Sequence, residues 1–257
     1  MKFSIVTCTW NSAATLLDTL RSVRSQTHPD VEHIFVDGGS SDGTLQMIAT
    51  QCPGAKLLTG VSGGISRAMN AGILAATGDV IAHLHSDDFY AADDVLARVA
   101  GVMYRSQAKW AFGDMDVLRN NIRSPASRRR TAYTPSAYAR GSVAILHPTV
   151  FVSRDMFETV GLFDETLRYA MDIDLWLRIG PLYRPAELPF TVAVFRAHAG
   201  SLSTANPRAA RAEESAVRRR YFAHWPIDTL VCAARHTRMQ LRQRWVAGAG
   251  TACDPAA

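Results

Sequence analysis

The first ninety residues alternate short, β-branched apolar runs with stretches of helical character, and this alternation constrains the fold more than any other feature. Strands are predicted at residues 2–9, 33–36, 55–58 and 80–84. Helices are predicted between them, around residues 16–23, 44–50 and 65–73. Strands and helices alternating at this spacing predict an α/β fold with a doubly wound, mostly parallel sheet flanked by helices.

The second half of the chain is less regular. Strands are predicted at residues 110–118, 143–153 and 191–196, and a helix at 171–179. The arginine-rich, proline-punctuated segment 119–141 has the composition of a loop, and residues 205–246 are predicted to form helices outside the sheet. The length of 257 residues fits one large α/β domain with a tail, or two smaller domains.

Composition narrows the class of protein. The sequence has no long uninterrupted apolar span and no signal peptide, so we expect cytoplasmic residence. The four cysteines have no paired spacing, which indicates neither a zinc site nor a disulfide framework.

Basic residues are concentrated in two stretches. Seven arginines and no acidic residue lie between Asp116 and Asp155, and nine more arginines lie in residues 205–246. Such patches attract phosphate-bearing molecules, although a solvated face would have the same composition.

Polar side chains follow three of the predicted strands where each strand ends. Thr9 closes the first strand, Asp37 the second, and the pair Asp87-Asp88 follows the fourth. If these strands are neighbours, their carboxyl ends place the side chains along one edge of the sheet, where such folds bind ligands. Two adjacent carboxylates suit a divalent metal bound to phosphates, so the group predicts a nucleotide-diphosphate site. Taken singly, Asp37 could be a turn residue and Asp88 a helix cap.

The strings IVTCTWN, VDGGSSDGT, GISRAMNAGI and HSDD resemble the nucleotide-binding half of family 2 glycosyltransferases with the GT-A fold, especially the bacterial branch that assembles polysaccharides and cell-envelope glycans. The resemblance continues through residues 147–178 and 195–203. It implies a GT-A domain over residues 1–204, divided into a nucleotide-binding half (1–118) and an acceptor half (119–204). It leaves residues 205–257 outside this domain, and we expect them to form a basic helical extension.

The resemblance assigns roles residue by residue. Asp172, in AMDIDLWLR, matches the catalytic aspartate that deprotonates the acceptor hydroxyl in a direct displacement with inversion. The resemblance assigns uridine-side contacts to Thr9 and Asp37. It assigns further contacts with the donor to Arg67, Asp87, Arg196 and His198. The metal ligands that it implies are Asp88, Asp87 and His198. The implied cofactor is Mn²⁺ or Mg²⁺, the implied donor is a nucleotide-diphosphate sugar, and the implied enzyme is of the hexosyltransferase type.

Three positions depart from the family pattern. His85 stands where Asp or Asn is common, Met171 where an acidic residue is common, and Arg67 where Asp is frequent. The changes at His85 and Met171 put metal binding in question. The change at Arg67 means that the resemblance does not predict which nucleobase the donor carries.

Two other functions remain open at this stage. A metal phosphohydrolase would use His83, His85, Asp87 and Asp88, but would need further ligands from other strands. A nucleotide-sugar-binding protein weakened in catalysis is the second alternative, through the changes at His85 and Met171. A Rossmann dehydrogenase is disfavoured because no G-x-G-x-x-G follows the first strand.

For the acceptor we expect a glycan or a polyprenyl-diphosphate-linked molecule. The basic stretches would then make peripheral contact with an anionic membrane at the inner face. Nucleic acid is not expected as a partner, because the aromatic residues that stack on bases are sparse among these arginines.

Overall fold

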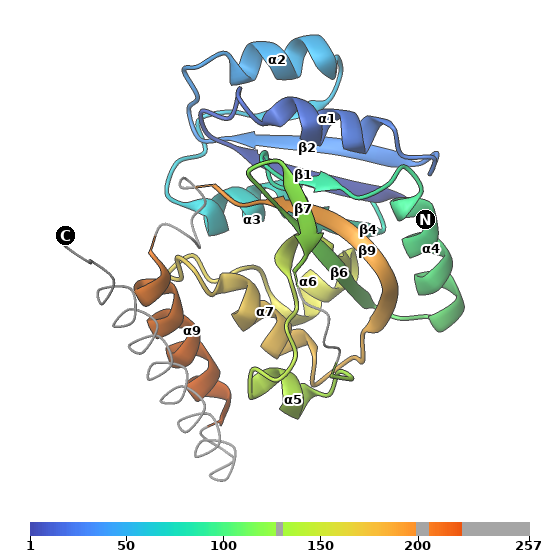
Figure 1. Cartoon of the computed structure of the whole chain (residues 1–257), viewed down its shortest axis with the longest axis vertical. Helices are drawn as coiled ribbons and strands as arrows, with labels where there is room; N and C mark the ends of the chain where they lie inside the picture. The colour runs from blue at the N-terminus through green and yellow to red at the C-terminus, as the bar shows by residue number, and fades with distance from the viewer. Residues whose placement is uncertain (127–130, 199–205, 223–257) are drawn as a thin grey trace, which may run out of the picture.

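A computed structural model describes residues 1–126, 131–198 and 206–222. Within these residues nine strands form one sheet in the order β3-β2-β1-β4-β8-β6-β9-β5, with β7 paired to β6. β1 and β2 lie side by side in this sheet (Figure 1). The strands are β1 (Phe3–Thr9), β2 (Val31–Asp37), β3 (Lys56–Leu58), β4 (Val80–His83), β5 (Phe89–Tyr90), β6 (Trp110–Arg119), β7 (Ile122–Pro125), β8 (Val150–Ser153) and β9 (Ala186–Arg196). The helices are α1 (Leu16–Arg24), α2 (Thr44–Gln51), α3 (Ile65–Ala75), α4 (Val95–Ser106), α5 (Pro135–Ala139), the 3₁₀ turn η1 (His147–Thr149), α6 (Arg154–Val160), α7 (Met171–Ile179) and α9 (Pro207–Phe222).

The first half of the sheet is parallel, as the sequence predicts. β1 lies between β2 and β4, and its last residue, Thr9, pairs in register with Asp37 at the end of β2. Because all three strands run the same way, their carboxyl ends meet at one edge. The predicted neighbourhood of the first, second and fourth strands is therefore confirmed.

The second half adds antiparallel pairs. β8 runs antiparallel to both β4 and β6, while β6 and β9 pair in parallel with an irregularity around Asp114. The predicted α/β class with flanking helices is confirmed, and the complete sheet is mixed.

Alternation along the central strands separates two apolar layers. Val6 and Ile34 face α3, whereas Ile5 packs with α4 and Phe35 with α1 and α2. Successive side chains of a strand point to opposite faces, so one strand serves both layers. The sheet is thereby covered on both faces and leaves its carboxyl edge to the loops.

Two segments differ from the sequence prediction. Residues 119–141 include strand β7 and helix α5, because Asn120 and Asn121 adopt positive φ angles that close a hairpin and Thr134 caps the helix through its hydroxyl. The strand predicted over residues 143–153 is confined to β8, because Pro148 lies in the 3₁₀ turn that precedes it.

Helix α9 lies in the predicted basic extension and packs against α7 and α5 (Figure 1). Its Val217 is 0% exposed and belongs to the same apolar cluster as the α7 side chains. No helix in the described part of the chain is both long enough and apolar enough to cross a membrane.

Close packing of α3 on β1 yields a stability prediction. A Cβ atom at Gly72 would lie 2.3 Å from Val6 Cγ1, so Gly72→Ala should lower the free energy of unfolding by about 1–3 kcal/mol. Gly101 in α4 is the matched control, because a Cβ there meets only the end of the Arg105 side chain and alanine favours helix. Urea unfolding should show Gly101→Ala at or above wild-type stability. Equal effects of the two substitutions would contradict this packing.

Candidate active site

Thr9 and Asp37 form a hydrogen-bonded pair at the carboxyl edge. Thr9 Oγ1 donates to Asp37 Oδ2 at 2.8 Å, and the same carboxylate accepts from Gly39 N, Ser40 N and Ser40 Oγ. Burial alone would raise the pKa of Asp37, but the hydrogen bonds from Ser40, Thr9 and Gly39 hold it below its ordinary value. Asp37 is therefore a buried, ionised anchor that fixes the turn after β2.

Trp10 follows Thr9 and is the aromatic residue that the sequence analysis missed. Its side chain is 71% exposed, and its Cδ1 would lie 3.6 Å from a Cβ atom at Gly38. A solvent-exposed indole beside a glycine turn offers a flat surface on which the aromatic ring of a ligand can stack. A large aromatic residue directly after a strand that ends at the ligand edge is the signal that could have identified it.

Arg67 lies on the first turns of α3 and is exposed. Its Cδ would lie 3.1 Å from a Cβ atom at Gly63, which has a φ of +107°. The guanidinium stem therefore runs along the glycine turn that precedes α3.

Asp87 and Asp88 occupy different environments. Asp87 Oδ2 lies 2.9 Å from His198 Nε2. Asp88 is 2% exposed, and its Oδ1 accepts from Arg196 N at 3.1 Å. Burial and the neighbouring Asp87 raise the pKa of Asp88 well above its ordinary value.

Arg196 fastens the end of β9 to this motif. Its Nη2 donates to Asp18 Oδ2 at 2.5 Å, and its Nε donates to the carbonyl oxygen of Asp87 at 3.2 Å. The pair Arg196 and His198 therefore meets Asp87-Asp88 through both backbone and side chains. This places all four residues, which the sequence separates by more than a hundred positions, in one corner of the sheet edge.

Asp172 lies in the first turn of α7. Its Oδ1 accepts from Ile173 N at 2.7 Å, its Oδ2 lies 3.9 Å from His147 Nδ1, and its side chain is 20% exposed. Burial raises its pKa to about 6; the Ile173 amide opposes the rise, Glu214 adds to it and Arg218 opposes it. A carboxyl group with this pKa is largely ionised at neutral pH and can still accept a proton.

Two histidines, His147 and His85, lie between Asp172 and the Asp87-Asp88 motif, and His83 lies beside them. The His147 ring stacks on His85 with centroids 5.1 Å apart and an interplanar angle of 2°, and His83 lies 5.5 Å from His147. Burial lowers the pKa of each ring, so all three are neutral at pH 7. His85, the departure from the family pattern, therefore packs between the motif and the histidine that faces Asp172.

Within the described residues, no group of three or more His, Cys, Asp or Glu side chains converges on a point where a metal could bind. The pair Asp87 and His198 does converge, with one carboxylate oxygen and one imidazole nitrogen 2.9 Å apart. Mg²⁺ and similar ions at phosphate sites are held by one or two protein groups while the substrate phosphates and water fill the other positions. The residues present fit such a shared ion.

The comparison with known families identifies relatives of this chain. The model of glycosyl transferase family 2 matches residues 4–160. A PGL/p-HBAD biosynthesis glycosyltransferase of Mycobacterium bovis is 32% identical over 183 residues, which are 68% of this chain and 68% of that protein.

Solved structures resemble the fold. Staphylococcus aureus TarS 1–349 in complex with UDP-GlcNAc superposes with a TM-score of 0.69 at 21% identity, over 84% of this chain and 65% of that one. The mannosyltransferase PcManGT from Pyrobaculum calidifontis, in complex with GDP-Man and Mn²⁺, gives 0.66 at 16% identity, over 99% of this chain and 76% of that one. The chain spans 37% of a longer TarS structure. At these identities the likeness concerns the fold, and it confirms the predicted GT-A architecture.

The raised pKa of Asp172 predicts a pH-dependent stability. Its folded value of about 6 exceeds the ordinary 3.8, so the fold favours the protonated form. This contribution is fully present below about pH 4 and is lost as the pH rises through 6. Asp172→Asn, which does not titrate, should therefore gain stability over wild type between pH 4 and pH 8, by up to about 3 kcal/mol. Urea unfolding of both proteins across this range measures the gain, and a difference that stays constant with pH would contradict the assignment.

Proposed function

This chain belongs to glycosyl transferase family 2, and we propose that it moves a sugar from a nucleotide diphosphate to an acceptor hydroxyl in one inverting displacement. One observation carries the proposal. Asp172, with a pKa near neutrality, lies against the histidine stack that begins in the Asp87-Asp88 motif. A proton acceptor and a phosphate-binding corner are the two parts that such a transfer requires.

We assign the donor to the carboxyl edge. The exposed Trp10 indole offers a stacking surface to the nucleobase, beside the turn that Asp37 and Thr9 hold rigid. Arg67 adds a positive charge beside the glycine turn before α3, a turn that Val61 N joins to the carbonyl oxygen of Asp37. UDP-GlcNAc on TarS and GDP-Man on PcManGT support a nucleotide-sugar donor for this chain. They do not distinguish between uracil and guanine as its nucleobase.

Asp87 and His198 are the residues that would hold a divalent ion on the diphosphate. When bound, Mn²⁺ or Mg²⁺ supplies charge neutralisation to the leaving diphosphate. Asp88 has a different task in this proposal. One oxygen of its carboxyl group accepts from Arg196 N of β9 and so keeps Arg196 and His198 beside the motif.

The base is Asp172. Its carboxylate takes the proton from the acceptor hydroxyl while the hydroxyl oxygen forms the new bond to the anomeric carbon. The bond from that carbon to the diphosphate oxygen breaks, and the nucleotide diphosphate leaves with the electron pair. A base whose pKa lies near the operating pH serves this transfer best.

The acceptor is proposed to be a glycan or a polyprenyl-diphosphate-linked molecule at the cytoplasmic face of the membrane. The exposed basic residues of 119–141 and of α9, among which the buried Arg218 does not count, support an anionic partner, each contributing about 1 kcal/mol near an anionic surface. Arg128, Arg129 and Arg130, and the tail after Phe222, lie outside the described residues.

Loss of the base gives the first test of this function. Asp172→Asn should lower kcat by about 10²- to 10⁴-fold with little change in donor affinity, because the amide cannot accept the proton. In wild type, kcat/KM should rise about tenfold per pH unit below pH 6 and level off above it. Transfer assays with UDP- and GDP-sugars measure both quantities. Retention of the wild-type rate by Asp172→Asn would remove Asp172 from the mechanism.

The metal assignment has its own test. Asp87→Asn and His198→Ala should each raise the concentration of Mn²⁺ needed for half-maximal activity by about tenfold or more. Asp155→Asn, which removes a surface carboxylate paired with Lys109, is the matched control and should leave the titration unchanged. If both site variants titrate like wild type, the ion does not bind between Asp87 and His198.

A further inference from the structure

The backbone that leads into α7 is held by a side chain from α9. Glu213 Oε1 accepts from Arg168 N at 3.0 Å, Tyr169 N at 2.6 Å and Ala170 N at 2.8 Å, and its Oε2 accepts from Arg168 N at 3.2 Å. Ala170 is the residue before Met171, where α7 begins, and Asp172 is two positions further on. One carboxylate therefore fixes three consecutive amides directly before the proposed base.

The anchor is itself fixed in place. Val217 of α9 is fully buried in the main apolar cluster. Arg218, also buried, donates to the carbonyl oxygens of Tyr138 and Ala139 in α5, and its Nε donates to Glu214 Oε1 at 2.8 Å. These contacts leave α9 little freedom to slide along α7.

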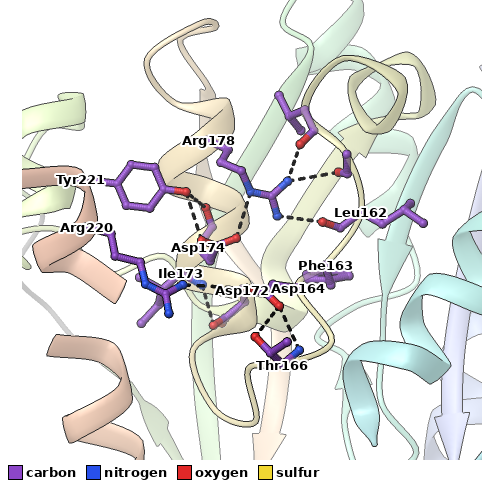
Figure 2. Close-up of polar contacts among 12 residues, drawn as sticks. Leu162, Phe163, Asp164, Thr166, Asp172, Ile173, Asp174, Arg178, Arg220 and Tyr221 are labelled. Carbon is purple, nitrogen blue, oxygen red and sulfur yellow. Dashed lines mark hydrogen bonds and ion pairs between the residues drawn. The ribbon is translucent and has the colours of Figure 1, made fainter. Parts of the chain in front are cut away.

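A second contact between α9 and α7 lies one turn further along α7. Tyr221 Oη donates to Asp174 Oδ1 at 3.1 Å, and Asp174 Oδ2 accepts from Arg178 Nε at 2.9 Å (Figure 2). Arg178 continues to the carbonyl oxygens of Val160 and Leu162. Asp172 thus lies between the Glu213 anchor on one side and the Tyr221–Asp174–Arg178 group on the other.

We propose that α9 is part of the active site, with Glu213 as a positioning residue that sets the place of Asp172 through the backbone of residues 168–170. The proposal rests on the role of Asp172 as base. Displacing a catalytic group by about 1 Å can cost about 10²-fold in rate, so an anchor of this kind acts on kcat without touching substrate. The family model matches only residues 4–160, so neither α7 nor α9 receives this assignment from it.

The charged and titratable groups around Asp172 also come from several elements. Glu214 and Arg218 face it from α9, His147 from η1, and the Tyr138 hydroxyl from α5. Release of the Glu213 anchor shifts Asp172 relative to all four groups. A positioning role therefore predicts a displaced acid limb in the pH profile together with a lower kcat.

The test compares three variants of the full chain. Glu213→Ala removes the acceptor, Glu213→Gln keeps an oxygen in nearly the same volume, and Glu158→Ala removes an exposed carboxylate from α6 as the control. We expect Glu213→Ala to lower kcat by about 10- to 100-fold with donor KM within about twofold. Glu213→Gln should stay within about threefold of wild type in kcat, and Glu158→Ala should match wild type.

Hydrogen exchange of the amides of residues 168–170, which donate to Glu213, gives a readout that needs no activity. These amides should exchange at least about tenfold faster in Glu213→Ala and at the wild-type rate in Glu158→Ala. Unchanged exchange would overturn the anchor. If Glu213→Ala exchanges faster but keeps the wild-type kcat and pH profile, Glu213 does not act on Asp172. The same conclusion follows if its loss of kcat only matches the fraction of the protein that is unfolded. Wild-type protein inactive with every nucleotide sugar would count against the proposed transfer, while the exchange data would still decide whether Glu213 holds this backbone.

Discussion

Residues 161–170 cross from α6 to α7 without regular secondary structure, and their buried backbone groups therefore need partners from elsewhere. Asn70 of α3 satisfies both the amide and the carbonyl of Phe163, and Ser66 of the same helix donates to the carbonyl oxygen of Leu167. Glu213 supplies the acceptor for the amides of residues 168–170. Two helices far apart in sequence thus determine where α7 begins, and with it the position of Asp172.

Three aspartates of this fold have environments that shift their pKa values differently. Asp37 accepts hydrogen bonds from hydroxyls and amides and stays ionised, whereas Asp88 is buried beside another carboxylate and favours its protonated form. Burial raises the pKa of Asp172 to about 6, and a backbone amide and Arg218 partly offset that rise. Pairs of groups whose environments separate their pKa values in this way are typical of acid–base sites.

The sequence was informative wherever the contact followed from local periodicity. The β-branched runs predicted β1, β2 and β4, and parallel pairing then brought Thr9, Asp37 and the Asp87-Asp88 motif to one edge. The spacing of apolar residues placed α7 correctly from Met171 to Ile179. The contacts of Glu213 with residues 168–170 were not predictable in this way, because they join segments more than forty positions apart and depend on how α9 packs. The stack of His147 on His85 was missed for the same reason.

The proposed single displacement, with Asp172 as the base, fixes the configuration of the new glycosidic bond. Proton NMR of the first product formed from an α-linked nucleotide sugar reports that configuration before any slow equilibration. We expect a β-linked product, because one displacement inverts the anomeric carbon. An α-linked first product would require a second displacement or a front-face reaction, and would contradict the mechanism.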